Sequence, residues 1–152
     1  MNKQLGLSAV SYLKHWIGTP YIWGGQDFSG FDCSGIIHEV LQAYGIEKRG
    51  FDSTAHELYL IHKDKIINQY GPYNIPHPGC LVFWFNNGKA IHVEMVSEVI
   101  GDNVFVIGAS GGGSDVTTTE KASKKNAYIK QNIIGYRGIN FKIVDPFLRT
   151  SP

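Results

Sequence analysis

The pattern of apolar and polar residues predicts helices in the first part of the chain and strands in the second. Apolar side chains recur at helical spacing in three segments, 7–17, 32–44 and 53–62. The second segment has the broadest apolar stripe, and Gly45 is a suitable residue to end it. We expect these helices to pack their apolar sides on the strands that follow.

After Pro72, proline and glycine become more frequent, and short apolar runs typical of strands replace the helical spacing. Strands are predicted at 81–85, 90–99, 104–107 and 133–139, with a glycine loop at 108–114. Asn87-Gly88 is a strong signal for a hairpin turn between the first two strands. Helices followed by antiparallel strands indicate an α+β fold, and because no linker divides the chain we expect one domain over 1–152.

Length and charge exclude several classes of protein. A chain of 152 residues can bury a core without disulfide or metal staples. Its 14 Lys and Arg against 13 Asp and Glu lack the basic excess of a nucleic-acid-binding protein. No apolar stretch approaches the roughly 20 residues that span a bilayer. The N-terminus also lacks the apolar centre of a secretory signal, so we expect a chain made in the cytoplasm.

Cys33 is the candidate nucleophile. It follows Asp32, a residue type that caps helices, and it opens the helix predicted at 32–44. The positive end of a helix dipole and its unpaired backbone N–H groups favour a thiolate. Ser34 and Gly35 are small and leave room for a substrate. This position predicts a reactive cysteine, and the alternative is an inert cysteine at a helix start.

His92 is the candidate base. In the strand predicted at 90–99, alternation places His92 and Glu94 on one face and Val93 and Met95 on the other. Such a polar pair fits a strand that carries a site, and it also fits a solvated face. A cysteine at a helix start with a histidine on a later strand is the pattern of a Cys–His nucleophile and base. We therefore expect folding to bring Cys33 and His92 together.

Residues 108–112 offer a rival motif, because they match the G-x-S-x-G pattern of serine hydrolases with Ser110 as nucleophile. That motif must be followed by a helix, and the segment after it is poor helix material. No histidine follows Ser110 in the chain. The glycine loop also lacks the Lys-Ser/Thr that ends a phosphate-binding loop.

Cys80 and His77 raise two further alternatives. They could bind a metal together with His92 or Cys33, but the chain has no Cys-x-x-Cys or His-x-x-x-His pair, so we expect no metal. Cys33 and Cys80 could form one disulfide. That bond would block the nucleophile, so we expect both thiols to be reduced and Cys80 to be buried and inert.

Four motifs occur in a fixed order along the chain. They are Gly18-Thr19-Pro20-Tyr21-Ile22-Trp23-Gly24-Gly25, Phe31-Asp32-Cys33-Ser34-Gly35, Pro78-Gly79-Cys80-Leu81-Val82-Phe83-Trp84 and Ile91-His92-Val93. This set resembles the NlpC-type cell-wall cysteine peptidases, over a core of about 8–140. The resemblance implies a papain-like domain that cuts peptidoglycan stem peptides without a metal or organic cofactor.

The resemblance also implies roles for individual residues. Cys33 matches the family's nucleophile, and His92 matches its base. Tyr21 matches a tyrosine that lines the site and helps at the oxyanion. Asp32, Ser34 and Trp23 match positions that line the substrate cleft. The bond implied is the amide between D-glutamate and the adjacent diamino acid.

Two positions depart from the family pattern. Cys80 stands where the family has an aspartate after Pro-Gly. Gly108 stands where the family has the polar residue that orients the catalytic histidine, and glycine has no side chain for that task. The third member of the catalytic set is therefore open.

We expect a backbone carbonyl or a water to bind the second nitrogen of His92, with Ser110, Glu94 and Asp115 as the alternatives. Glu94 lies two positions along the strand, about 6.5–7 Å away between Cα atoms, which is a long reach. Replacing any one of the three alternatives is expected to cost less than about tenfold in rate.

Other outcomes stay open at this point. The same thioester chemistry serves an amidase or an acyltransferase, and a catalytically inactive wall-binding module would keep the cleft. We expect a monomer whose partner is the peptidoglycan stem peptide. Delivery to the wall would follow a phage-type or secretion-system route.

Overall fold

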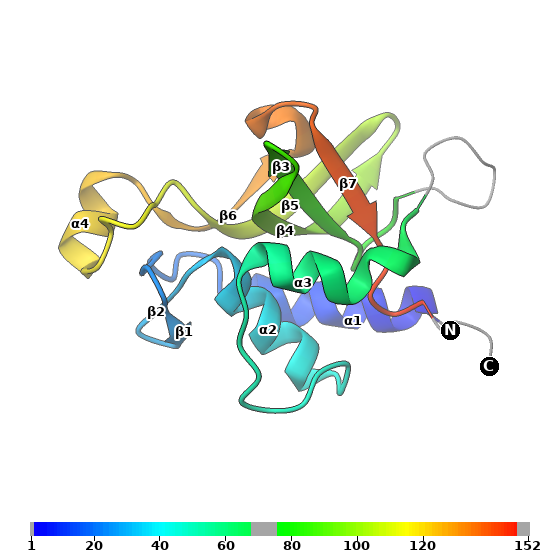
Figure 1. Cartoon of the computed structure of the whole chain (residues 1–152), viewed down its shortest axis with the longest axis horizontal. Helices are drawn as coiled ribbons and strands as arrows, with labels where there is room; N and C mark the ends of the chain where they lie inside the picture. The colour runs from blue at the N-terminus through cyan, green and yellow to red at the C-terminus, as the bar shows by residue number, and fades with distance from the viewer. Residues whose placement is uncertain (1, 68–75, 149–152) are drawn as a thin grey trace.

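The computed structural model describes residues 2–67 and 76–148. The helices are α1 (Asn2–Lys14), α2 (Cys33–Ala43), α3 (Ala55–His62) and α4 (Thr119–Lys124), with 3-10 turns η1 (Lys63–Lys65) and η2 (Ile134–Arg137). The strands are β1 (Gln26–Asp27), β2 (Gly30–Phe31), β3 (Leu81–Asn86), β4 (Lys89–Ile100), β5 (Asn103–Ser110), β6 (Tyr128–Ile133) and β7 (Phe141–Val144). Helices α1, α2 and α3 lie together on one side of the sheet (Figure 1). The α+β architecture predicted from the sequence is confirmed.

Helix α2 forms where the apolar stripe is broadest, and it packs on β4 and β5. Its core-facing side chains are all fully buried: Ile36, Ile37, Val40 and Leu41. Each stabilises the fold by roughly 1.5–3 kcal/mol relative to leaving it in water. Gly45 follows the helix with a φ of 71°, in the left-handed region that glycine adopts without strain. This packing fixes the first turn of α2, and hence Cys33, relative to the sheet.

The large sheet has five antiparallel strands in the order β6-β5-β4-β3-β7. The predicted hairpin joins β3 to β4 through Asn87 and Gly88, whose φ values of 51° and 76° match a type I′ turn. In this register Trp84 lies opposite His92. The hairpin therefore sets which β3 side chains surround the candidate base.

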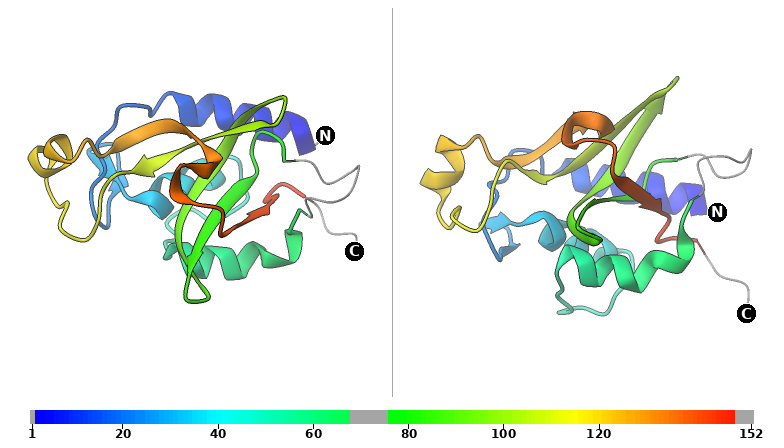
Figure 2. Two further views of the ribbon diagram at one scale, coloured as in Figure 1. Left: turned by 90° about the horizontal axis from the view of Figure 1, so that it is seen from above. Right: turned by 45° about the horizontal axis from the view of Figure 1, so that its top comes forward.

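Alternate residues of β3 point to opposite faces of this sheet. Leu81 and Phe83 pack in the larger core under the helices, whereas Val82 and Trp84 pack in a second apolar cluster. Ile134 of η2 packs against that second cluster. Figure 2 shows the strong twist of the strands above the helices. Both faces of the sheet are thus partly covered, which allows polar side chains on the second face to be buried.

The larger core cluster joins side chains from Ala9 to Phe147, so the described residues form one folded unit. No helix within 2–67 or 76–148 is long and apolar enough to cross a membrane.

The predicted strand at 133–139 is wrong. Residues 134–137 form the turn η2, with Gly138 at a φ of 95°, and strands β6 and β7 flank that turn. Strand β6 was missed because most of its residues are polar or exposed at the sheet edge, so it lacks an apolar pattern. The glycine loop is also shorter than predicted, because β5 continues to Ser110.

Two helices differ from the prediction. Helix α1 runs from Asn2 to Lys14, so it starts and ends earlier in the chain than the predicted helix at 7–17. Helix α4 lies just beyond the segment judged poor helix material, where the Thr118 hydroxyl accepts a hydrogen bond from the Lys121 N–H and caps the first turn.

Candidate active site

The thiol of Cys33 lies in the first turn of α2, and Asp32 caps that turn. The Asp32 carboxylate accepts hydrogen bonds from the backbone N–H of Gly35 at 2.7 Å and of Gly24 at 3.1 Å. Cys33 is a free, partly exposed cysteine at the positive end of the helix dipole. The structure confirms the predicted cap, and its position favours a reactive thiolate.

His92 lies on β4 beside Trp84, with 5.6 Å between the two ring centroids. Its Nε2 donates a hydrogen bond to Glu94 Oε2 at 2.8 Å, which leaves Nδ1 for the thiol of Cys33. Burial by itself lowers the pKa of His92, but hydrogen bonding and charge from Cys33 and Glu94 outweigh it, and the pKa is raised. The imidazole therefore interacts with both a thiol and a carboxylate, as a catalytic base does in a triad.

Glu94, and not the expected backbone carbonyl or water, accepts the hydrogen bond from the second nitrogen of His92. Its side chain is fully buried, and Oε2 accepts a second hydrogen bond from the Tyr136 hydroxyl. The two methylenes of the side chain span the distance along β4, because both side chains point to the same face of the strand. The reach that appeared too long between Cα atoms is therefore covered by the side chain itself.

Gly108 explains how this carboxylate fits. A Cβ atom at Gly108 would lie 2.4 Å from Glu94 Cγ, closer than real Cβ atoms approach a neighbour. The stem of Glu94 therefore fills the space that a side chain at 108 would need. Gly108 has no side chain where the family resemblance implies one that orients the histidine. The side chain of Glu94, from the neighbouring strand, fills that space.

Ser110 and Asp115 do not reach the imidazole. Ser110 is buried at the end of β5, and its hydroxyl makes no hydrogen bond with any residue that the structure describes. Asp115 is exposed and accepts a hydrogen bond from Lys125 Nζ at 2.6 Å. Of the three alternatives, the structure brings Glu94 to His92.

Tyr21 is buried close to Cys33 and Asp32. Burial raises the pKa of Tyr21, and the charges of Cys33 and Asp32 act in the same direction. A Cβ atom at Gly112 would lie 2.2 Å from the Tyr21 ring, so the glycine loop packs directly against this ring. The hydroxyl is therefore protonated at neutral pH and is able to donate a hydrogen bond to an oxyanion.

Ser34 and Trp23 lie on either side of the Asp32 cap. Ser34 is buried in the first turn of α2, 3.4 Å from the Asp32 carboxylate. Trp23 is 54% exposed, and its backbone N–H donates to the Val116 carbonyl at 2.7 Å. The next residue, Gly24, donates its backbone N–H to Asp32, so this exposed indole belongs to the loop that contacts the start of α2.

Within the described residues, one group has the spacing that a bound metal ion needs. The ligand atoms of His77, Cys80 and Asp145 lie within 4.8 Å of one another. This set differs from the predicted alternative, which combined His77 and Cys80 with residues of the catalytic pair. Cys80 lies four residues before Trp84 on β3, about 13 Å along the strand, so the group is remote from His92.

Sequence reasoning missed Tyr136 and its neighbour Arg137. Both fall in the segment predicted as a strand, and neither belongs to a motif that marks chemistry. Only the turn η2, packed back over the sheet, brings the Tyr136 hydroxyl to Glu94. No local signal in the sequence could have found this contact.

The fold and the site together define a class. A cysteine at a helix N-terminus faces a histidine on an antiparallel sheet, which is the arrangement of papain-like cysteine hydrolases. The NlpC/P60 family matches residues 18–137, and the chain belongs to this family.

Several known proteins are similar to this chain. It is 35% identical over 94 residues to Protein P54 of Enterococcus faecium, covering 59% of the chain and 16% of P54. It is 48% identical over 33 residues to a gamma-D-glutamyl-L-lysine dipeptidyl-peptidase of Bacillus cereus, covering 22% of the chain and 10% of that relative. It is 30% identical over 99 residues to the murein DD-endopeptidase MepH of Escherichia coli, covering 64% of the chain and 34% of MepH. The matches span about a third or less of each of these relatives.

Solved structures support the fold. The NlpC/p60 domain of the peptidoglycan hydrolase SagA aligns over 91% of this chain and 97% of its own length, with a TM-score of 0.53 and 23% identity. An NlpC/P60 family protein from Bacillus cereus aligns over 92% of this chain and 39% of its own, with a TM-score of 0.63 and 20% identity. Both comparisons concern the fold alone.

Proposed function

We propose that this protein is a cysteine endopeptidase that cuts an amide bond in peptidoglycan stem peptides. The observation that carries the proposal is the set of Cys33, His92 and Glu94, in which a partly exposed thiol and a buried carboxylate flank one imidazole. Membership of the NlpC/P60 family and the printed names of two relatives, a gamma-D-glutamyl-L-lysine dipeptidyl-peptidase and a murein endopeptidase, support the substrate class.

In the first half of the reaction, His92 Nδ1 takes the proton of the Cys33 thiol. The sulfur attacks the carbonyl carbon of the substrate amide, and the carbonyl oxygen becomes an oxyanion. The backbone N–H of Cys33 and the hydroxyl of Tyr21 are placed to donate hydrogen bonds to that oxygen. The C–N bond then breaks, and His92 returns the proton to the leaving amine.

In the second half, water replaces the amine. His92 takes a proton from the water, whose oxygen attacks the thioester carbon, and the C–S bond breaks. The thiol of Cys33 recovers its proton from the imidazole. Every proton moves through His92, so the reaction needs an imidazole held in one orientation with one tautomer.

Glu94 supplies that orientation in our proposal. Its bond to Nε2 holds the ring so that Nδ1 faces the thiol, and its charge stabilises the imidazolium that forms after proton transfer. Tyr136 holds the carboxylate in turn. A protein with a complete Cys–His–carboxylate set fits an enzyme better than an inactive wall-binding module.

The bond we propose is the γ-linked amide between D-glutamate and the following diamino acid. The family resemblance implies this bond, and the name of the Bacillus cereus relative supports it. MepH is named for a D,D bond instead, so the test must separate these products.

Purified cell walls, digested with the protein and analysed by mass spectrometry, test the proposal. We expect fragments that begin at the diamino acid, and none from a Cys33→Ala variant with unchanged thermal unfolding. Intact stem peptides released from the sugar strand would show an amidase instead. Loss of peptide cross-links alone would show D,D cleavage, and joining of stem peptides to an added amine without hydrolysis would show an acyltransferase.

A further inference from the structure

A pocket of about 370 Å³ is formed by residues of β3 and β4, the last residue of η2 and the segment that follows it. One of its walls is the indole of Trp84, which lies opposite His92 in the sheet with 5.6 Å between the ring centroids. Ile91 and Ile139 line it as well, and both are largely exposed to solvent. A substrate residue next to the scissile bond therefore finds an apolar surface at this point.

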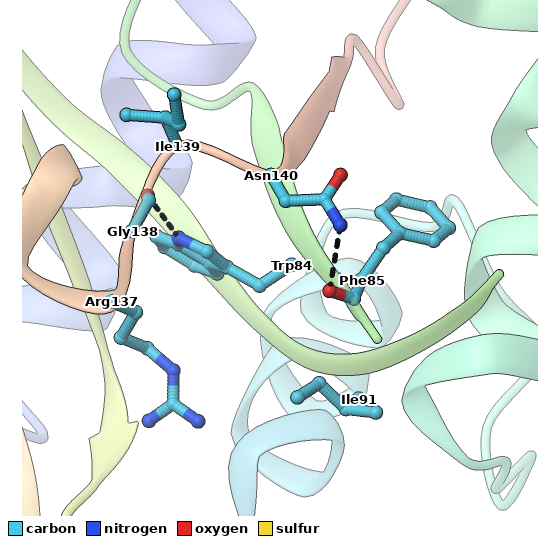
Figure 3. Close-up of a pocket in the computed structure, with 7 residues that line it drawn as sticks. All are labelled: Trp84, Phe85, Ile91, Arg137, Gly138, Ile139 and Asn140. Atoms are coloured by element: carbon cyan, nitrogen blue, oxygen red, sulfur yellow. Dashed lines mark hydrogen bonds between the residues drawn. The ribbon is translucent and has the colours of Figure 1, made fainter. Parts of the chain in front are cut away.

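Two side-chain hydrogen bonds hold the rim of this pocket to β3. Trp84 Nε1 donates to the Gly138 carbonyl at 3.3 Å, and Asn140 Nδ2 donates to the Phe85 carbonyl at 3.0 Å (Figure 3). The backbone N–H of Phe85 also donates to the Asn140 carbonyl at 2.9 Å. The pocket is consequently fixed in shape before a ligand arrives, which lowers the entropic cost of binding.

Arg137 is the charged group of this pocket. Its guanidinium carbon lies 5.9 Å from the centre of the Tyr136 ring, and no carboxylate among residues 2–67 and 76–148 forms an ion pair with it. The hydroxyl of Tyr136 donates a hydrogen bond to Glu94, and Glu94 in turn bonds His92. The guanidinium therefore lies against a side chain that is linked to the imidazole through one carboxylate.

An apolar wall with one unpaired guanidinium is a site for a residue that carries an aliphatic stem and a carboxylate. Guanidinium binds carboxylate through two parallel hydrogen bonds, which gives geometric selectivity besides the charge. Stem peptides offer two such carboxylates beside the γ-linked amide. One is the free α-carboxylate of the glutamyl residue, and the other is a second carboxylate on the diamino acid.

We infer that Arg137 binds a free substrate carboxylate beside the scissile amide, and that the pocket takes the residue that leaves with the amine. This inference rests on the proposed function. The leaving amine receives its proton from His92, so the residue that carries it must lie close to the imidazole. The indole of Trp84, which forms one wall of the pocket, lies beside that ring. Diamino acids with a second carboxylate should therefore be preferred over lysine.

Four synthetic stem peptides test the inference. They combine lysine or diaminopimelate after the scissile amide with a free or an amidated glutamyl α-carboxylate before it. We expect wild-type kcat/KM to be roughly fivefold higher for diaminopimelate than for lysine, mainly through KM, since an exposed charge pair contributes up to about 1 kcal/mol. Arg137→Gln should bring the ratio to within about twofold, and Arg137→Lys should keep part of it.

Arg49→Gln is the matched control, because it removes an exposed arginine from the loop after α2 and should keep the wild-type ratio. A preference that follows the glutamyl α-carboxylate, and disappears in Arg137→Gln, would keep the role of Arg137 but overturn the placement of the leaving residue. Ratios that are unchanged by Arg137→Gln for all four peptides would overturn the inference. Wild-type protein that cleaves none of them would contradict the proposed function instead.

Discussion

Among residues 2–67 and 76–148, two groups combine cysteine, histidine and carboxylate side chains, and one of them has the properties of a catalytic centre. Cys33, His92 and Glu94 form the first group, and their imidazole bonds the carboxylate at 2.8 Å. In the second group His77 Nε2 donates to Asp145 Oδ2 at 3.1 Å, beside Cys80. The residue types are nearly the same, so their surroundings must decide what they do.

The thiols differ most. Cys33 is partly exposed and begins a helix, whereas Cys80 is fully buried just before β3. A helix N-terminus supplies unpaired N–H groups that favour a thiolate, and a strand start supplies none. Cys80 also packs in the second apolar cluster, where no substrate reaches it. Access and backbone environment therefore separate a nucleophile from a structural thiol more sharply than neighbouring residues do.

The largest expected effect compares the two cysteines in activity. Cys33→Ala should lower turnover by about 10³-fold or more, because it removes the nucleophile. Cys80→Ala should keep turnover within about threefold and lower thermal stability by a few degrees, because it leaves a small cavity. Muropeptide release and thermal unfolding of both variants measure this. Wild-type turnover in folded Cys33→Ala would refute the mechanism.

Alkylation separates the same two thiols directly. Iodoacetamide at pH 6–7 should label Cys33 on the order of 10²-fold faster than Cys80, since only the first is accessible and favoured as thiolate. Peptide mapping by mass spectrometry gives both rates in one sample, and denaturant should remove the difference. Equal rates in the folded protein would mean that the helix start does not activate Cys33.

The two carboxylates give the next largest contrast. Glu94→Gln should lower kcat on the order of 10²-fold, because the amide cannot stabilise the imidazolium. The structure thus revises the tenfold limit that the sequence suggested for this residue. Asp145→Asn, the matched control, should leave kcat within about twofold.

The same Glu94→Gln variant should also change the pH profile. Glu94 helps to raise the pKa of His92, so its loss lowers that pKa, and the limb of the kcat/KM profile due to the imidazole should move to lower pH. A profile that keeps its shape and position while kcat falls would indicate a packing defect rather than a lost orienting charge.

The smallest expected effect concerns stability at the second group. The hydrogen bond that His77 donates to Asp145, followed by its interaction with Cys80, raises the pKa of His77 to about 10. A histidine whose pKa is raised on folding stabilises the folded state. This stabilisation is complete below the pKa of the unfolded chain, near 6.5, and it is lost as the pH rises through the pKa of the folded protein. Since 20% of the His77 side chain is exposed to solvent, His77→Gln should cost roughly 1 kcal/mol at pH 6, or a few degrees in Tm, and almost nothing above pH 10.

Thermal unfolding of wild type and His77→Gln at pH 6, 8 and 10.5 measures this difference. A constant difference across these pH values would mean that packing, and not charge, is what His77 contributes.

Elements with strong local signals were predictable from the amino-acid sequence. The broad stripe of α2, the Asp32 cap and the Asn87-Gly88 turn depend on neighbours within a few residues, and all three are confirmed. These local signals also placed Cys33 at a helix start and His92 on a strand. Order and spacing of the motifs then supplied the family, which matches residues 18–137.

The hydrogen bond between His92 and Glu94 was not predictable from the sequence, because it depends on tertiary contacts. Glu94 had the right chemistry, but its fit depends on the missing Cβ at Gly108 of the neighbouring strand and on Tyr136 from a distant turn. The position of Arg137 in the pocket beside Trp84 also depends on tertiary structure, because η2 interrupts what the sequence pattern predicted as a continuous strand. Side-chain contacts between strands depend on register and on empty volume, and neither is encoded in a local pattern of residues.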